Sequence, residues 1–61
     1  MTLSNLLLIA YHVKHYTIVH NDGTTYHIHT FNNKYDIPQN LTEKVVSMFR
    51  AVDYDTLKIW I

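Results

Sequence analysis

The stretch HYTIVHNDGTTYHIHTF, from His15 to Phe31, decides the fold, because a turn signal stands between two runs of strand-forming residues. The turn signal is Asn21-Asp22-Gly23, and the runs on either side are rich in Thr, Tyr, Ile and Val. An Asn or Asp followed by Gly between two such runs is a strong local indication of a β-hairpin. The sequence therefore predicts antiparallel strands at residues 15–20 and 24–31.

The length of the hairpin loop decides which side chains share a face, since a shift of one residue moves every side chain to the other face. A three-residue loop would place Tyr16 opposite Ile28 and His15 opposite His29, with the apolar side chains collected on one face. A two-residue loop would mix apolar and polar side chains on both faces. We therefore expect the three-residue loop.

The segment before the hairpin, residues 3–13, is compatible with two structures. Apolar side chains alternate from Leu7 to Val13, which fits a strand that is apolar on both faces. The same segment fits a helix with Leu3 and Leu6 on one side. The Ile, Tyr and Val side chains beyond residue 8 favour the strand.

The segment after the hairpin predicts a helix and a final strand. Asn40 followed by Glu43 fits an N-cap with a capping box, and apolar side chains then continue at helical spacing. We expect this helix at about residues 41–52. Residues 56–61 alternate apolar and polar side chains, which is typical of a strand.

These elements predict an α+β fold. A three- or four-stranded antiparallel sheet, built from the hairpin at 15–31 and the C-terminal strand, is packed by the one helix. The chain holds one Gly, one Pro and no linker, so we expect residues 1–61 to form a single compact domain. The absence of cysteine is typical of proteins in a reducing compartment, and we expect a cytoplasmic protein.

Composition also narrows the classes of partner. Hydrophobic residues make up 48% of the chain and charged residues 16%, which favours a fold whose surface is partly covered by a larger protein or by a second copy. The net charge is zero, so the positive charge typical of nucleic-acid binders is missing. The apolar run from Leu6 to Ala10 is too short to span a bilayer, and no Lys or Arg precedes it as in a signal peptide. We expect no nucleic-acid or membrane partner.

Four of the five histidines fall within residues 15–31. In the expected register His27 and His29 point the same way and His15 lies across the strand, so three imidazoles would converge on one point. Three imidazoles with an open fourth position suit zinc. A Zn site at His15, His27 and His29 is therefore one hypothesis. The preferred interpretation is a solvated histidine face, because no carboxylate stands where it would orient the rings.

His15 and His29 would also supply a general base and acid, with Lys14 stabilising charge, as a metal-independent ribonuclease needs. The segment KHYTIVHNDGTTYHIH, followed by an Ile-Pro turn and the expected helix, resembles small HicA-type mRNA interferase toxins, in which a His precedes a hairpin and a helix follows. Val13-Lys14 stands where those toxins usually carry Gly-Ser. A small ribonuclease toxin with a catalytic His is thus a further alternative.

The eight aromatic side chains exceed what one helix and one sheet face can bury. Tyr and Trp are frequent anchors of protein interfaces, and four of these side chains are expected to remain partly exposed as contacts to a partner. They are Tyr11, Tyr35, Tyr54 and Trp60.

The sequence shows no nucleophile motif, phosphate loop or carboxylate pair. It favours a non-enzymatic interaction module that binds and inhibits a larger protein, of the kind encoded by phages and mobile elements.

Overall fold

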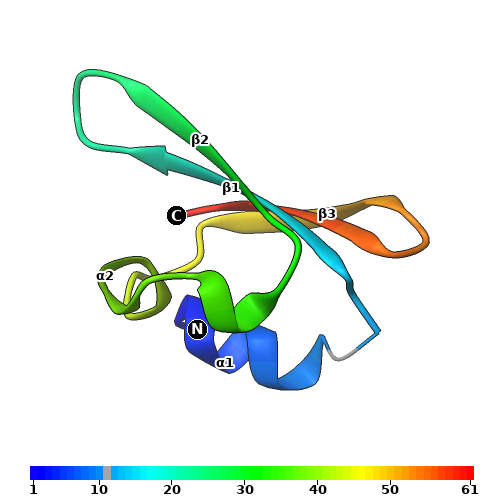
Figure 1. The fold of residues 1–61 in the computed structure, drawn as a ribbon. Coiled ribbons are helices and arrows are strands. Elements are labelled where there is room, and N and C mark those ends of the chain that lie inside the picture. The colour runs from blue at the N-terminus through cyan, green and yellow to red at the C-terminus, as the bar shows by residue number, and fades with distance from the viewer. Residues whose placement is uncertain (11) are drawn as a thin grey trace.

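The computed structural model of the chain describes residues 1–10 and 12–61. The elements, in chain order, are helix α1 (Leu3–Ile9), strands β1 (His15–Asn21) and β2 (Tyr26–Phe31), the 3-10 helix η1 (Lys34–Asp36), helix α2 (Gln39–Thr42), and strands β3 (Met48–Asp53) and β4 (Thr56–Trp60). The strands form one sheet, and the helices lie together on one side of it (Figure 1). The predicted α+β fold with a four-stranded sheet is confirmed.

The sheet is mixed, whereas a fully antiparallel sheet was expected. Its strand order is β2-β1-β4-β3. Two antiparallel hairpins, β1 with β2 and β3 with β4, are joined by the parallel pairing of β1 with β4. This parallel pairing continues past the end of β4, where the backbone N–H of Ile61 donates to the carbonyl of Val19 at 2.9 Å.

The hydrophobic core lies between the two central strands and the helices. On β1 and β4 the register sets Tyr16 beside Leu57 and Ile18 beside Ile59, and all four side chains are buried. Each buried Leu or Ile contributes about 1.5 to 3 kcal/mol relative to an exposed position. The helices and the segment between them complete the core with Leu3, Leu6, Leu7, Ile37 and Leu41.

Helix α1 corrects the strand that the sequence favoured for residues 3–13. Leu3, Leu6 and Leu7 form the i, i+3, i+4 pattern of one helix face, and all three are buried. The Thr2 side chain caps the helix by accepting a hydrogen bond from the N–H of Asn5 at 3.3 Å. Burial of this face against the sheet outweighs the weak strand preference of the residues that follow. None of the helices in the described residues is long and apolar enough to cross a membrane.

The helix expected at residues 41–52 is also corrected. Helix α2 is a single turn at Gln39–Thr42, and β3 occupies most of the remaining segment. The residue at the N-cap position is Pro38, so the expected Asn40 cap does not form. Apolar runs of this length fit a helix or a strand equally well. The strand is formed here because β4 lies two residues away along the chain and pairs with it.

The hairpin forms as predicted, but its register differs from the expected one. Tyr16 pairs with Phe31 instead of Ile28, and the loop is correspondingly longer. Gly23 has φ 103°, a left-handed conformation that favours glycine. The longer loop is stabilised because the Asp22 side chain accepts hydrogen bonds from more than one backbone N–H group of the loop.

Asp22 organises the hairpin loop. Its Oδ1 accepts hydrogen bonds from the backbone N–H groups of Thr24 at 3.1 Å and Thr25 at 2.9 Å. Its Oδ2 lies 2.9 Å from Nε2 of His27. The hydrogen bond from His27, followed by those from the two amides, holds the pKa of the Asp22 carboxyl well below its usual range.

We expect the hairpin loop to keep its structure when the pH falls through the range in which ordinary aspartates titrate. A carboxyl with a lowered folded-state pKa stabilises the fold above its unfolded pKa and loses that contribution only as the pH falls through the lower, folded value. NMR spectra should therefore show no titration step for the Thr24 and Thr25 amides around pH 4, about the reference value for Asp. A step there at both amides would contradict the persistence of these hydrogen bonds in solution. Asp22→Asn is the control that removes the titrating group.

Candidate functional site

The face of the sheet that points away from the helices, called the outer face here, is set by the alternation of side chains along each strand. Ile18 and Ile59 point into the core, so their neighbours Val19 and Trp60 point outward. Val19 agrees with this assignment, because it is only 6% exposed and yet lies outside the core cluster. Its neighbours across the sheet are Ile28 and Trp60.

Four apolar side chains cross the outer face in one line, called the apolar row here. The register pairs Val19 with Ile28 on one side and with Trp60 on the other, and it pairs Trp60 with Met48. The row thus spans all four strands. Its ends are open to solvent, with Ile28 66% and Met48 53% exposed. Apolar side chains that are exposed on a sheet face in this way are typical of interaction sites.

Two cationic side chains border the apolar row. Lys58 on β4 pairs with Arg50 on β3, and like charges placed directly opposite each other are unfavourable. Within the described residues, neither forms an ion pair with a carboxylate. Nζ of Lys58 lies 5.1 Å from the ring centroid of Trp60, so this charge is held close to the apolar row. The outer face therefore combines apolar surface with uncompensated positive charge.

The aromatic residues predicted to contact a partner lie on different parts of the molecule. Trp60 belongs to the apolar row and is half-buried. Tyr54 is 91% exposed in the turn between β3 and β4, and Tyr35 is 84% exposed on η1. Tyr11 lies outside the described residues. Sequence reasoning missed the aliphatic members of the row, because only the strand order and register bring them beside Trp60.

The structure does not bring the three predicted zinc ligands together. His29 pairs with Ile18, so His29 and His27 point to the side of the helices, whereas His15 belongs to the outer face. Nδ1 of His15 lies 2.9 Å from Oδ1 of Asn32. Among the described residues, no group of three His, Cys, Asp or Glu side chains has the geometry to hold a metal ion. The site was expected because the sequence favoured a different hairpin register, in which His15 lies opposite His29.

Three of the four hairpin histidines instead form a ladder with one another. The ring centroids of His20 and His27 are 6.4 Å apart, and those of His27 and His29 are 6.5 Å apart. Phe31 continues the ladder at 6.3 Å from His29. The ladder runs from Phe31, which packs against the core, toward the end of the hairpin that projects away from the helices (Figure 1), and His27 and His29 are exposed to solvent. The sequence favoured a solvated face shared by His15, His27 and His29, whereas in the structure His27 and His29 are exposed on the face opposite to that of His15.

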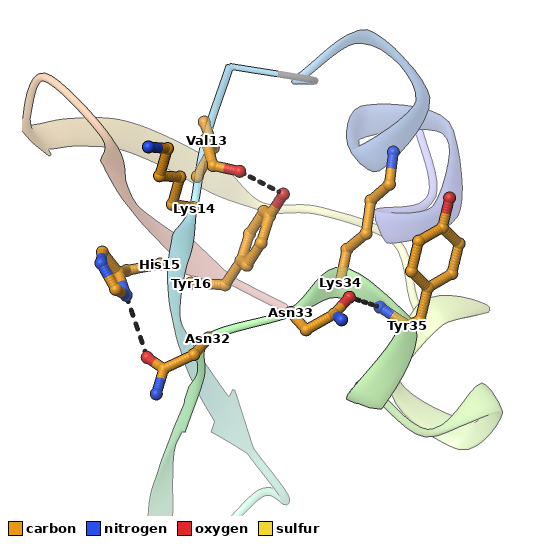
Figure 2. A pocket seen from close by; sticks show the side chains of 8 residues that line it. All are labelled: Val13, Lys14, His15, Tyr16, Asn32, Asn33, Lys34 and Tyr35. Carbon is orange, nitrogen blue, oxygen red and sulfur yellow. Dashed lines mark hydrogen bonds between the residues drawn. The ribbon is translucent and has the colours of Figure 1, made fainter.

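A cleft of about 390 Å³ opens where β1 begins and β2 ends. It is lined by residues 13–16 and 32–35, which the antiparallel pairing of the hairpin brings side by side. Figure 2 shows Tyr16 between the two segments, with Lys14 and His15 on one side and Lys34 and Tyr35 on the other. The described residues that line the cleft include two lysines and no carboxylate.

Tyr16 anchors the floor of the cleft. Its hydroxyl donates to the carbonyl of Val13 at 2.9 Å, which ties the start of β1 to the chain before it. Burial raises the pKa of the Tyr16 phenol, and the nearby Tyr35 adds to this shift. Tyr16 is therefore a hydrogen-bonded structural residue rather than an acid or base at neutral pH.

The features on which the toxin resemblance depended are not found together. The predicted C-terminal helix is a single turn followed by two strands. His15 and His29, the expected base and acid, point to opposite faces of the sheet. The register thus separates the acid and base pair in the same way as it separates the zinc ligands.

Comparisons with known proteins give no relative for this chain. No family model matches it, and neither a search of curated proteins nor a search of solved structures finds a match. The function is therefore inferred from the surfaces described above, the outer face and the cleft.

Proposed function

We propose that the protein is a small, non-enzymatic interaction module that binds a larger protein through the outer face of its sheet and inhibits it by covering a surface. The observation that carries this proposal is the apolar row, which none of the helices in the described residues covers and whose ends are open to solvent. Aromatic residues, Met and Arg are enriched in the centres of protein interfaces, and this face supplies all three types. We place the module in the cytoplasm on the basis of its cysteine-free composition.

The charge of the outer face supports a partner with a particular chemistry. Lys58 and Arg50 face each other beside Trp60 and have no carboxylate partner among the described residues. A partner that places a carboxylate between them would relieve their repulsion as the apolar row becomes covered. The matching surface is therefore an apolar patch with an acidic residue at its border.

Replacing Ile28 by Lys tests this function, because the substitution puts a charge at an exposed end of the apolar row without opening the core. The binding protein is first identified from cells of the natural host, and its affinity for purified variants is then measured by calorimetry. We expect Ile28→Lys to weaken binding by about 30-fold, the effect of losing roughly 2 kcal/mol of binding free energy at one contact residue.

Leu8→Lys is the matched control, since Leu8 is 74% exposed on α1, on the helix side of the sheet. It should leave the affinity unchanged. Loss of binding with Leu8→Lys but not with Ile28→Lys would place the interface on the helix side and refute the proposed one. Light scattering of the purified chain distinguishes the remaining case, a dimer dispersed by Ile28→Lys, in which a second copy covers the outer face instead of a larger protein.

A further inference from the structure

Strand β2 forms one edge of the sheet, and no strand of the described residues pairs with its open side (Figure 1). The direction of its backbone groups follows from a hydrogen bond on the neighbouring strand, in which the carbonyl of Val19 accepts from the N–H of Ile61 on the β4 side. Val19 and its opposite residue Ile28 therefore exchange no hydrogen bonds, because opposite residues alternate between bonded and unbonded pairs. The N–H and C=O groups of Ile28 thus point to the open side, as do those of Tyr26 and Thr30.

This edge lacks the features with which monomeric proteins keep strand edges from pairing. Those features are Pro, a bulge, or a charged side chain, Lys above all. The sequence of β2, YHIHTF, contains no Pro, Lys, Arg, Asp or Glu, and its pairing with β1 shows no register shift. The opposite edge, β3, carries Arg50 and a register shift between Ala51 and Asp53. Strand β2 is therefore the edge that is open to a further strand.

A second copy of β2 fits this edge when the two strands run antiparallel about a two-fold axis at Ile28. Ile28 then lies opposite Ile28 of the second copy, and Tyr26 lies opposite Thr30, so that every outward backbone group finds a partner. An aromatic side chain opposite a β-branched one is a favourable pair. Tyr26 and Ile28 are both 66% exposed in the single chain, and the pairing covers part of each. It also joins the apolar rows of the two copies end to end.

The same register places histidines of the two copies opposite each other. His27 of one copy lies opposite His29 of the second, in closely spaced pairs that exchange no hydrogen bonds. Within one copy, the titratable groups that face these rings are His20, 6.4 Å from His27 between ring centroids, and the Asp22 carboxylate, 2.9 Å from Nε2 of His27. Asp22 binds His27 with or without the second copy. Protonation of the rings therefore adds a repulsion that exists only when the copies are paired.

We propose that two copies of the chain pair through β2 into one continuous sheet when the histidines are neutral, and that protonation of His27 and His29 separates them. The assembly closes at two copies, because the edges that remain are the two β3 strands with Arg50 and the register shift. The dimer leaves the outer face uncovered. The proposal therefore does not depend on the interaction function.

Sedimentation equilibrium of the purified chain at pH 8 and pH 5.5, with a chelator present to exclude bridging metal ions, tests the proposal. We expect a dimer at pH 8 and a dissociation constant about tenfold larger at pH 5.5, since two histidine pairs then oppose like charges. His29→Gln removes both pairs and should make the two constants equal. His20→Gln is the matched control, because it removes a histidine that does not face the second copy, and it should keep the tenfold difference.

Substitutions of Thr30 test the backbone pairing itself. Thr30→Pro removes an N–H that points to the open side, a change that edge strands tolerate, and it should give a monomer at both pH values. Thr30→Val keeps this N–H and should dimerise as the native chain does. Met48→Lys changes the opposite end of the apolar row and should also leave the dimer intact. A dimer that Met48→Lys separates and Thr30→Pro does not would be held by the outer face, which would refute pairing through β2.

Amide hydrogen exchange measures the pairing without any substitution. At pH 8 the amides of Ile28 and Thr30 should exchange more slowly as the protein concentration rises, because the second copy accepts their hydrogen bonds. Exchange that does not depend on concentration, or a chain that stays monomeric at pH 8 up to about 1 mM, would overturn the proposal. Equal dissociation constants of the native chain at the two pH values, or a pH dependence that His29→Gln retains, would contradict the role assigned to the histidines.

Discussion

Replacing Ile18 by Ala should lower the free energy of unfolding by about 2 to 5 kcal/mol, the range for removing a fully buried Ile. Ile18 has no exposed surface and lies beside Ile59 at the centre of the sheet. A core as small as that of this chain supplies only a few kcal/mol of net stability. Much of the variant should therefore be unfolded at room temperature. Urea denaturation followed by the fluorescence of Trp60, the single Trp, measures the loss.

Ile28→Ala is the matched control, because it makes the same substitution in the same hairpin but on the outer face. Ile28 is largely exposed, so its loss should cost less than about 1 kcal/mol. If the two variants were equally unstable, the assignment of Ile18 to the core and Ile28 to the outer face would be wrong. The register on which both the apolar row and the histidine ladder depend would be wrong with it.

Replacing Leu6 by Ala should also cost about 2 to 5 kcal/mol, whereas Leu8→Ala should be close to neutral. Leu6 is buried under the sheet and Leu8 is exposed, since they lie on different sides of α1. In a strand, residues 6 and 8 would share a face and the two substitutions would have similar effects. Denaturation of the two variants thus decides between the helix and the strand that the sequence favoured. Equal losses would contradict α1.

Features that depend on neighbouring residues were predictable from the sequence. The hairpin follows from Asn21-Asp22-Gly23 and its flanking runs, and the C-terminal strand follows from the alternation after residue 56. Both signals lie within a few residues, so these predictions do not depend on how the rest of the chain folds. The α+β class was predicted correctly, although the one helix was expected at residues 41–52 and the helices that form are α1, η1 and α2.

Features that depend on which segments pair as strands, and in which register, were not predictable. The apolar spacing before Val52 fits a helix, and only the presence of β4 as a partner turns it into β3. The same limit applies to the sites. Trp60 was recognised as a contact residue from its type, but its neighbours in the apolar row come from other strands. His15 and Lys14 were singled out for catalysis, and the hairpin register that places them at one cleft with Lys34 was not the expected one.

The parallel pairing of β1 with β4 makes the folding rate depend on a contact between segments from the two ends of the chain. Each hairpin closes locally, and hairpins form within about 1 to 10 microseconds. Neither buries the core alone, because Ile18 belongs to one hairpin and Ile59 to the other. Docking them requires closure of the long segment between β1 and β4, which is slower than any local step. The transition state for folding should therefore be the encounter of two preformed hairpins.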